Sequence, residues 1–336
     1  MTVSVSIVGA TGAVGKEMIT CLYKERFPLS SVRLFASSRS AGADLDTPFG
    51  PLVVEEFKVD TVSESKIVLL AVSGEFSKQY AFSLVDRGCV VIDNSSAFRY
   101  ESNIPLIVPE LNGTEIDIRK CRSGCLIANP NCSTAILAMV LFPIYKKFGV
   151  RKVICSTYQA ASGAGEAGMQ ELELAMRAHV NNEKFNQDVF SHNLCGNVIP
   201  CIDTVLENDY TKEEMKMVWE LGKIFSNQDM KISCTAVRVP TVRAHCIAAT
   251  VELDRLPDSI DGLRELLSEA PGVEVVDDPR NKQYPVPETA SENANVQVGR
   301  IRRNLVFENG IDLFVCGDQL LRGAALNAVR IARLVL

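Results

Sequence analysis

The first third of the chain alternates between short apolar runs and longer stretches with apolar residues at helical spacing. Apolar runs predict strands at residues 3–8, 32–36, 67–72 and 90–93, and helical spacing predicts helices at 13–25 and 75–87. The runs at 67–72 and 90–93 are almost continuously apolar, which is typical of strands buried on both faces of a parallel sheet. This strand–helix–strand rhythm predicts an α/β domain with a right-handed, Rossmann-type doubly wound parallel sheet.

The pattern changes after Cys132. Longer strand-like segments follow at 153–160, 234–239, 246–253, 296–303 and 304–315, with helical segments at 168–180, 212–225 and 259–268. Long strands with few helices predict an α+β domain with a mainly antiparallel sheet, which can offer one face to a partner subunit. Residues 320–336 read as a terminal helix that returns to the first domain. We therefore expect one domain at 1–130 plus 316–336 and a catalytic and dimerisation domain at 131–315.

Composition narrows the class of protein. A chain of 336 residues with 47% hydrophobic and 23% charged residues is long enough for two soluble domains. No apolar run reaches the ~18 residues of a membrane span, and no signal peptide is visible, so a cytoplasmic protein without a membrane partner is expected. The net charge of −6, without a dense basic patch, argues against nucleic acid as a partner.

The cysteines are numerous but irregularly spaced. Eleven are present, with no Cys-x-x-Cys or Cys/His cluster, so no metal site is expected. A reduced compartment is favoured over a disulfide scaffold, and most of the thiols should be inert small hydrophobic side chains.

A glycine-rich turn follows the first predicted strand and opens the first helix. The turn comprises Gly9, Ala10, Thr11, Gly12, Ala13, Val14 and Gly15, where backbone N–H groups can approach a pyrophosphate. About twenty residues on, the second strand ends at Ser37, Ser38, Arg39 and Ser40 rather than at an acidic residue that would bind the ribose hydroxyl of NAD. Hydroxyls and an arginine can accommodate a 2′-phosphate, so NADP is the predicted cofactor.

Cys132 lies between the apolar run 125–128 and a helix-like run at 135–141. A thiol at such a junction lies near a helix N-terminus, where the backbone N–H groups and the helix dipole favour the nucleophilic thiolate. Covalent catalysis through a thioester is the functional interpretation, and a small residue in a strand-to-helix turn is the alternative.

Other polar residues follow predicted strands or share a helix face. Arg99 follows the strand at 90–93 and is either an anion clamp or a solvated loop arginine. Gln159 precedes the small-residue loop that contains Ser162 and Gly163. Glu220 and Lys223 share one face of a predicted helix, which on its own favours a surface ion pair. Arg238 and His245 are seven residues apart, and His245 lies in an apolar stretch that would equally suit a satisfied core histidine.

Taken in order, these motifs resemble the aspartate-β-semialdehyde dehydrogenase family over essentially the whole chain. The resemblance rests on the glycine turn, Ser95-Ser96-Ala97-Phe98-Arg99, Asn129-Pro130-Asn131-Cys132-Ser133-Thr134, Gln159, the Glu/Lys pair, the stretch from Arg238 to His245 and Arg322-Gly323-Ala324-Ala325-Leu326-Asn327. It implies an NADP-dependent, phosphorylating aldehyde dehydrogenase that reversibly converts β-aspartyl phosphate to aspartate semialdehyde in lysine (diaminopimelate), threonine and methionine biosynthesis. It also implies a homodimer.

The resemblance assigns roles to individual residues. It implies that Cys132 forms the thioester, His245 is the acid/base residue and Gln159 orients the covalent intermediate. Substrate binding falls to Arg238 for the α-carboxylate, Glu220 for the ammonium group, and Arg99, Lys223 and Asn131 for the phosphoryl group. Ser162, Gly163 and Gln319 are expected to contact the cofactor, alongside the glycine turn and residues 37–40.

Two departures and three alternatives stay open. Thr241 and Arg243 stand where many relatives have an apolar residue and a glycine before the histidine, so Arg243 competes with Arg238 as the carboxylate ligand.

An N-acetyl-γ-glutamyl-phosphate reductase would perform the same chemistry on an acylated substrate, for which Glu220 has no use. An acyl-CoA reductase would need a basic channel, which the sequence does not show. A catalytically silent dinucleotide-binding paralogue would not need Cys132, Gln159, Arg238 and His245 together.

Overall fold

The computed structural model describes residues 2–336. It divides into two compact units: unit 1 runs up to Asn131 and resumes with Ala324–Leu336, and unit 2 is Cys132–Gly323. Within residues 2–336, no helix is long and apolar enough to cross a membrane, and no group of three or more His, Cys, Asp and Glu side chains is placed to hold a metal ion.

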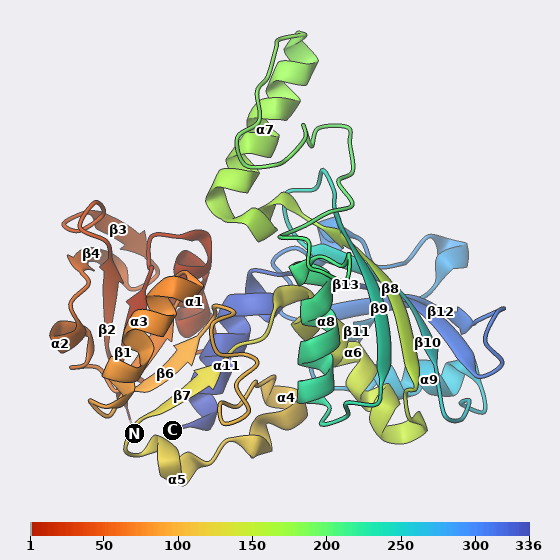
Figure 1. Ribbon diagram of the computed structural model, residues 1–336, viewed down its shortest axis with the longest axis horizontal. Coiled ribbons are helices and arrows are strands. Elements are labelled where there is room, and N and C mark those ends of the chain that lie inside the picture. The colour runs from red at the N-terminus through yellow and green to blue at the C-terminus, as the bar shows by residue number, and fades with distance from the viewer. Residues whose placement is uncertain (1) are drawn as a thin grey trace. The chain divides into compact units, whose positions relative to one another are not determined.

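Unit 1 is built on a seven-stranded sheet (Figure 1). Its strands, in the spatial order β3-β4-β2-β1-β5-β6-β7, are β1 (Val3–Val8), β2 (Leu29–Ala36), β3 (Asp44–Thr47), β4 (Gly50–Glu56), β5 (Ile67–Leu70), β6 (Val90–Asp93) and β7 (Cys125–Ala128). All pairings are parallel except β3 with β4. The predicted doubly wound parallel sheet is therefore confirmed, and every residue of β5 and β6 is buried. The β3–β4 hairpin escaped prediction because it lies at the sheet edge and is largely exposed.

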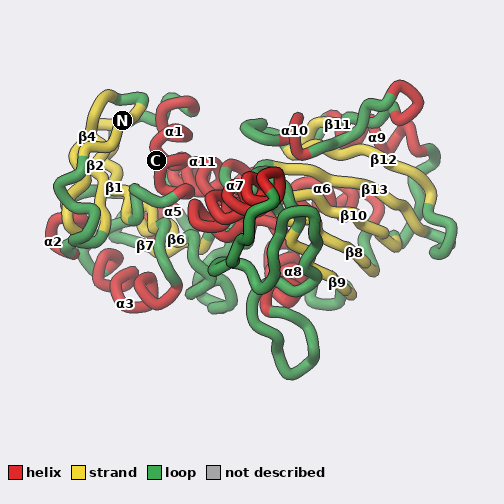
Figure 2. Tube along the Cα trace, turned by 90° about the horizontal axis from the view of Figure 1, so that it is seen from above, coloured by secondary structure: helices red, strands yellow, loops and turns green. Residues whose placement is uncertain are grey.

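Six α-helices of unit 1, within residues 2–336, accompany this sheet. They are α1 (Ala13–Lys24), α2 (Val59–Val62), α3 (Gly74–Val85), α4 (Pro109–Asn112), α5 (Ile118–Cys121) and α11 (Leu326–Leu334). The terminal helix α11 lies beside α1 in both views (Figures 1 and 2), so the end of the chain joins unit 1. Arg330 on α11 fixes this packing through hydrogen bonds to Glu110 at 2.6 Å and Glu25 at 3.2 Å.

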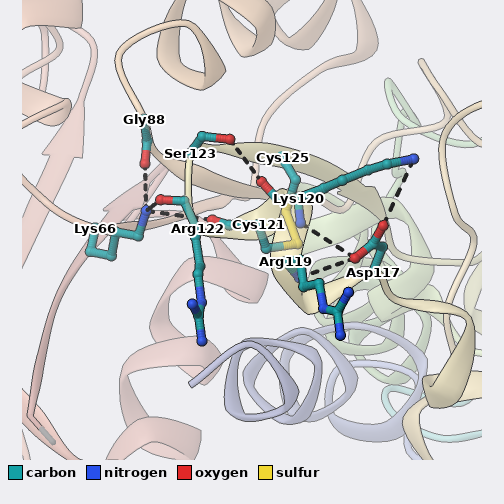
Figure 3. The surroundings of a disulfide bond; sticks show 9 residues. All are labelled: Lys66, Gly88, Asp117, Arg119, Lys120, Cys121, Arg122, Ser123 and Cys125. Carbon is teal, nitrogen blue, oxygen red and sulfur yellow. Dashed lines mark hydrogen bonds and ion pairs between the residues drawn. A yellow bond between two sulfur atoms is a disulfide. The ribbon is translucent and has the colours of Figure 1, made fainter.

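A disulfide joins the end of α5 to the start of β7, between Cys121 and Cys125 (Figure 3). The expectation that the cysteines are reduced is wrong for this pair. The α5–β7 turn brings their Cα atoms to 4.8 Å, a separation that suits a disulfide. Lys66 ties the same turn to the sheet, because its ammonium group donates to the carbonyls of Gly88 at 2.7 Å and Arg122 at 3.0 Å (Figure 3). Within residues 2–336, the other nine cysteines form no disulfide.

Unit 2 contains a six-stranded mixed sheet. Its strands, in the spatial order β11-β12-β13-β10-β8-β9, are β8 (Lys152–Gln159), β9 (Lys231–Arg238), β10 (His245–Glu252), β11 (Val273–Val275), β12 (Val296–Arg303) and β13 (Gly310–Gly317). The central pairings are antiparallel, as predicted, and the outer pairs β8–β9 and β11–β12 are parallel. The predicted strand at 304–315 begins too early, because Asn304 accepts backbone N–H groups of Val306 and Phe307 and makes residues 304–309 a turn.

Helices cover one face of this sheet. The helices of unit 2 are α6 (Cys132–Phe148), α7 (Gly165–Asn181), α8 (Lys212–Ile224), α9 (Ile260–Ser268) and α10 (Pro287–Ala290), with a π-helical turn at Leu321–Ala325. Helix α7 projects away from the sheet (Figure 1). Alternate residues of β8, from Val153 to Gln159, are buried, whereas Ile154 and Tyr158 on the opposite face are exposed. The polar residue Gln159 is thus directed into the covered face of the unit.

Candidate active site

Cys132 is the first residue of α6, and three residues separate it from the end of β7. The first turn of α6 contains no acidic residue, so nothing there opposes the attraction of the helix N-terminus for a thiolate. The thiol is half-buried, whereas six of the nine described cysteines outside the disulfide are buried. The local structure is therefore the strand-to-helix junction that the sequence predicted.

Three neighbouring strands bring Arg238, Gln159 and His245 to one end of the sheet. Arg238 pairs directly with Gln159 in the parallel β8–β9 register. His245 begins β10, and its neighbour Cys246 pairs with Tyr158, the neighbour of Gln159. All three side chains are buried, on strands far apart in the sequence. The sheet register thus explains how residues up to 86 positions apart in sequence, Gln159 to His245, form one cluster.

The His245 imidazole has a defined hydrogen-bonding pattern. Its Nδ1 accepts the backbone N–H of Ala160 at 3.0 Å, so in the neutral ring the proton lies on Nε2. Nε2 is buried and makes no hydrogen bond within residues 2–336. Burial, reinforced by the Arg238 charge, lowers the pKa of His245 to about 3. At neutral pH His245 therefore presents an Nε2–H donor to the site rather than a positive charge.

Arg238 is the cation of this cluster. Its Nη1 donates to the Ala160 carbonyl at 2.7 Å, and its guanidinium lies 5.7 Å from the centre of the Phe190 ring. Burial lowers the pKa of Arg238, and the charges of Glu213 and Cys132 oppose that shift. Arg238 is thus electrostatically coupled to the Cys132 thiol. It also lines a cavity of about 300 Å³ together with Asp203.

Gly163 lies against both Arg238 and His245. A Cβ atom at this position would lie 2.6 Å from Arg238 Nη1 and 3.2 Å from His245 Nε2. The small-residue loop after β8 therefore approaches the cluster as closely as a backbone can, and any side chain at Gly163 would displace the two catalytic candidates.

A buried carboxylate that the sequence reasoning missed adjoins Gln159. Glu213 Oε1 accepts the Gln159 amide at 3.1 Å, and its Oε2 lies 2.8 Å from Lys216, which also binds Asp203 at 2.9 Å. Burial lowers the pKa of Lys216, but Glu213 and Asp203 outweigh it and hold that pKa above its ordinary value. The Lys216 hydrogen bond likewise keeps the pKa of Asp203 low despite burial. The chain Gln159–Glu213–Lys216–Asp203 is therefore a charged network.

The start of α8 explains why Glu213 points inward. Thr211 and Glu214 form a capping box, and Glu214 also accepts the backbone N–H of Ala236 on β9 at 2.9 Å. This pins the first turn of α8 to the sheet, so the adjacent Glu213 meets Gln159. The signal was visible in the sequence, because Glu213 and Lys216 have the same i,i+3 spacing as Glu220 and Lys223.

Glu220 and Lys223 lie on α8 as well, but further from its start. Glu220 is fully buried and Lys223 is half-buried. Glu220 follows Glu213 by two helical turns, which separates them by about 10 Å along the helix axis. The two carboxylates therefore cannot serve the same small group of a substrate, and the one in contact with Gln159 is Glu213.

Arg243 is committed to another partner. Its Nε donates to Asp318 Oδ2 at 2.6 Å, and Asp318 is fully buried. The adjacent Gln319 accepts the Ala244 N–H at 2.9 Å and donates to Ser162 Oγ. Arg238, and not Arg243, is therefore the guanidinium beside Gln159 and His245.

Arg99 and Asn131 belong to unit 1. The buried Arg99 donates to the carbonyls of Asn129 at 2.8 Å and Asn94 at 2.7 Å. The Asn129 amide in turn binds Asn94 and accepts from Asn327. These residues follow β6 and β7, so they lie at the carboxyl edge of the sheet, where open α/β sheets bind ligands. Asn131 closes the same segment and is also buried.

The predicted dinucleotide residues gather around one pocket in unit 1. Its volume is about 360 Å³, and its lining includes Gly9, Thr11, Gly12, Ser37, Arg39 and Ser40. Gly9 has a φ of +84°, and a Cβ there would lie 2.2 Å from the Ala71 carbonyl oxygen. Helix α1 starts after Gly12 without a side-chain cap, so backbone N–H groups of its first turn can bind an anion. Ala13, Val14 and Gly15 form that turn, and Ser38 lies between two lining residues.

The doubly wound unit with its phosphate-type turn, and the second unit with its thiol, imidazole and guanidinium, define an oxidoreductase that uses a nicotinamide dinucleotide. Comparison with known proteins agrees. Residues 4–119 match the family model of the semialdehyde dehydrogenase NAD-binding domain, and residues 141–322 match that of the semialdehyde dehydrogenase dimerisation domain.

Curated relatives and solved structures identify the branch of this family. The chain is 42% identical over 333 residues to an aspartate-semialdehyde dehydrogenase of Campylobacter jejuni, covering 98% of this chain and 96% of the relative. Identity to that of Bacillus subtilis is 41% over 335 residues, with the same shares covered. The structure of aspartate semialdehyde dehydrogenase II from Vibrio cholerae, complexed with ASA, is 37% identical, has a TM-score of 0.94 and is matched over 99% of this chain and 98% of that one. The chain belongs to the aspartate-semialdehyde dehydrogenase family.

Proposed function

We propose that this chain catalyses the reversible, NADP-dependent reductive dephosphorylation of β-aspartyl phosphate to aspartate semialdehyde through a thioester on Cys132. The reaction belongs to the biosynthesis of lysine (by way of diaminopimelate), threonine and methionine. The observation that carries the proposal is the cluster in unit 2: a thiol at a helix N-terminus that is electrostatically coupled to Arg238, which adjoins His245 and Gln159. Thiol, imidazole and guanidinium are the groups that acyl transfer from a carboxylate-bearing substrate requires.

The covalent step uses the Cys132 thiolate as the nucleophile. Its sulfur attacks the acyl carbon, a C–S bond forms, and the C–O bond to the phosphoryl group breaks as phosphate leaves with the electron pair. When bound, the reduced nicotinamide supplies a hydride to the thioester carbonyl. The resulting thiohemiacetal on Cys132 then releases the aldehyde as the C–S bond breaks and the thiolate is restored.

His245 would stabilise charge on the reacting oxygen. In the neutral ring its buried Nε2–H is a preorganised donor that needs no rearrangement as negative charge develops. The hydrogen bond from Nε2–H strengthens as negative charge develops on the tetrahedral oxygen and weakens as that oxyanion collapses to the aldehyde. The Gln159 amide, held by Glu213 and Thr157, would orient the acyl group.

Recognition of the amino-acid end would fall to Arg238 and Glu213. Arg238 offers a two-pronged contact to the α-carboxylate. For the ammonium group we propose Glu213 in place of Glu220, because Glu213 contacts Gln159 whereas Glu220 lies two helical turns away. By the same geometry Lys216 replaces Lys223 as the ammonium group nearest to Gln159. For the phosphoryl group we propose Arg99 and Asn131.

The lining of the pocket in unit 1 supports NADP as the proposed cofactor. The uncapped start of α1 would receive the pyrophosphate, and Ser37, Arg39 and Ser40 would surround the 2′-phosphate. Arg39 provides the charge that a phosphate requires and that a ribose hydroxyl does not. Ser162, Gly163 and Gln319 remain our proposed contacts to the cofactor.

We also propose a homodimer built on unit 2. The sheet face opposite α6 exposes Ile154 and Tyr158. Both residues lie within 141–322, the range that matches the family model of the dimerisation domain. Apolar side chains exposed on one sheet face are typical of a surface that a second copy covers.

The test is phosphate-dependent reduction of NADP+ with aspartate semialdehyde, comparing the parent protein with Cys132→Ala. We expect activity in the parent and its loss by at least about 10³-fold in the variant. The matched control is Cys89→Ala, because Cys89 is a buried cysteine of unit 1 that forms no disulfide and has no proposed role. Full activity of Cys132→Ala would overturn the mechanism. Activity with N-acetylglutamate semialdehyde alone would identify an N-acetyl-γ-glutamyl-phosphate reductase, and NADP binding without turnover of either aldehyde would identify a non-catalytic paralogue.

A further inference from the structure

Ala244, the residue before His245, has a left-handed backbone conformation. Its φ is +68°, and it is fully buried. Residues other than glycine rarely adopt this conformation, and those that do are mainly Asn and Asp, whose side chains can hydrogen-bond locally. Alanine has no such side chain. The strained backbone of Ala244 must therefore be held by the surrounding structure.

Two contacts hold the segment. The Ala244 N–H donates to Gln319 Oε1 at 2.9 Å, and Arg243 Nε donates to Asp318 Oδ2 at 2.6 Å. Both partners follow β13, the strand that pairs with β10. The segment before His245 is thus fastened to the next strand by consecutive residues on each side.

Asp318 is itself rigidly fixed. Its Oδ2 also accepts the N–H of Glu292 at 2.6 Å, and its Oδ1 accepts the N–H groups of Leu320 at 2.9 Å and Leu321 at 3.1 Å. A fully buried carboxylate with four donors cannot turn to follow a moving arginine. Asp318 therefore acts as the fixed end of the contact and Arg243 as the end that is held.

We propose that Arg243, Asp318 and Gln319 form a clamp that keeps Ala244 left-handed and so aims the His245 imidazole. If Ala244 relaxed to negative φ, the Cα–Cβ direction of His245 would rotate and its Nδ1 would leave the Ala160 N–H. Arg243 is then a positioning residue, because it acts on the reaction only through Ala244 and His245. This inference rests on the proposed function for its kinetic test, but not for its spectroscopic one.

The experiment combines three variants. Arg243→Gln breaks the clamp, Ala244→Gly removes the strain that the clamp opposes, and the third protein carries both changes. The matched control is Arg264→Gln, because Arg264 Nε likewise donates to a buried aspartate, Asp277, at 2.8 Å. Asp277 also accepts two backbone N–H groups, and the hydrogen bonds of Arg264 go to Asp261, Asp277 and Ile301, none of which belongs to the site.

In the kinetic test, Arg243→Gln lowers kcat about tenfold and leaves the KM for the aldehyde within about twofold. The double variant recovers kcat to within about threefold of the parent, and Arg264→Gln keeps the parental kcat. The proposal is overturned if the double variant stays as slow as Arg243→Gln, if Arg243→Gln keeps full kcat, or if its main effect is a higher KM for the aldehyde. That last result would make Arg243 a substrate ligand.

The second measurement needs no substrate and stays informative when activity is absent. In protein labelled with ¹⁵N-histidine, the parent His245 ring shows a proton on Nε2 and none on Nδ1 and does not titrate between pH 5 and 8 (about the range of an ordinary histidine). We expect Arg243→Gln to make His245 titrate in this range and the double variant to restore the parental signal. An unchanged His245 signal in folded Arg243→Gln would contradict the clamp, whatever reaction the protein catalyses.

Discussion

The cluster around Arg238 and His245 in unit 2 and the pocket around the glycine turn in unit 1 hold their polar groups in different ways. In unit 2, Arg238, Gln159, Glu213 and His245 are buried, and each forms a hydrogen bond to a residue outside its own strand or helix. In unit 1, the polar lining of the dinucleotide pocket consists of a backbone turn and of exposed or half-exposed side chains, such as Ser37 and Arg39. Buried, fixed groups stabilise a particular charge distribution, whereas exposed groups adjust to a ligand.

The difference has a consequence for function. A change in unit 2 should act on the rate of the chemical step, because the displaced group cannot be replaced by water or by a neighbour. A change in the pocket around the glycine turn of unit 1 should act on cofactor affinity, in smaller steps. The predictions below test that contrast in order of decreasing effect.

The largest effect is expected for His245→Asn. Loss of the buried Nε2–H should lower kcat about 10²–10³-fold, with little change in the KM for NADP+. His179, which is exposed on α7, supplies the control His179→Asn. Steady-state kinetics of both variants are the measurement. Equal activity of His245→Asn and His179→Asn would remove His245 from the mechanism.

The next effect separates the two carboxylates of α8. Glu213→Gln should lower kcat/KM for aspartate semialdehyde about 10²-fold, because it removes the charge beside Gln159 and Lys216. Glu220→Gln should stay within about threefold of the parent in kcat/KM. A larger loss of kcat/KM in Glu220→Gln than in Glu213→Gln would identify Glu220 as the ligand of the substrate ammonium group. It would also show that contact with Gln159 does not mark the carboxylate that binds this group.

A third effect concerns stability in acid. The pKa of His245 is about 3 in the folded protein, whereas the ordinary pKa of a histidine in an unfolded chain is near 6.5. Between these two pH values the unfolded chain therefore binds a proton at His245 and the folded chain does not. The free energy of unfolding should therefore fall by up to about 1.4 kcal/mol per pH unit as the pH drops from 6.5 toward 3 from this group alone. Urea unfolding at several pH values measures the slope, and His245→Asn should flatten it. An identical slope in that variant would mean that His245 is not buried in its neutral form.

The smallest effect is expected in unit 1. Arg39→Ala should raise the KM for NADP+ about five- to tenfold, because one exposed charge is lost from the phosphate site, while kcat and the KM for NAD+ stay unchanged. The comparison with NAD+ is the internal control. A large fall in kcat for Arg39→Ala would contradict the expectation that the pocket in unit 1 sets cofactor affinity while the cluster in unit 2 sets the rate of the chemical step.

The periodicity of the sequence predicts the sheets well because it records burial. Runs such as 67–70 and 90–93 are buried throughout, and the alternation along β8 separates its two faces. It fails where exposure hides the pattern, as in the β3–β4 hairpin, and where a polar turn interrupts an apolar run, as at Asn304. The Cys121–Cys125 disulfide was missed because spacing alone does not show how α5 turns into β7.

The site was predictable as a set of residue types but not as a set of contacts. Cys132, Gln159, Arg238 and His245 stand in recognisable motifs. Glu213 and Lys216 were missed because two Glu/Lys pairs on α8 have equal spacing, and only the capping box at Thr211 shows which pair meets the sheet. Arg243 looked like a substrate ligand because Asp318, its partner, is 75 residues away.

The thioester on Cys132 can be tested directly by trapping it. The protein is mixed with aspartate semialdehyde and NADP+ in the absence of phosphate, and the reaction is quenched in acid. Intact-protein mass spectrometry then measures the mass of the protein, and peptide mapping locates any adduct. Since phosphate is the acceptor that would release the acyl group, we expect the mass to rise by one aspartyl group, located on Cys132 and removed when phosphate is added before the quench. Phosphate-dependent turnover without any adduct, or with an adduct on a different cysteine, would contradict the mechanism.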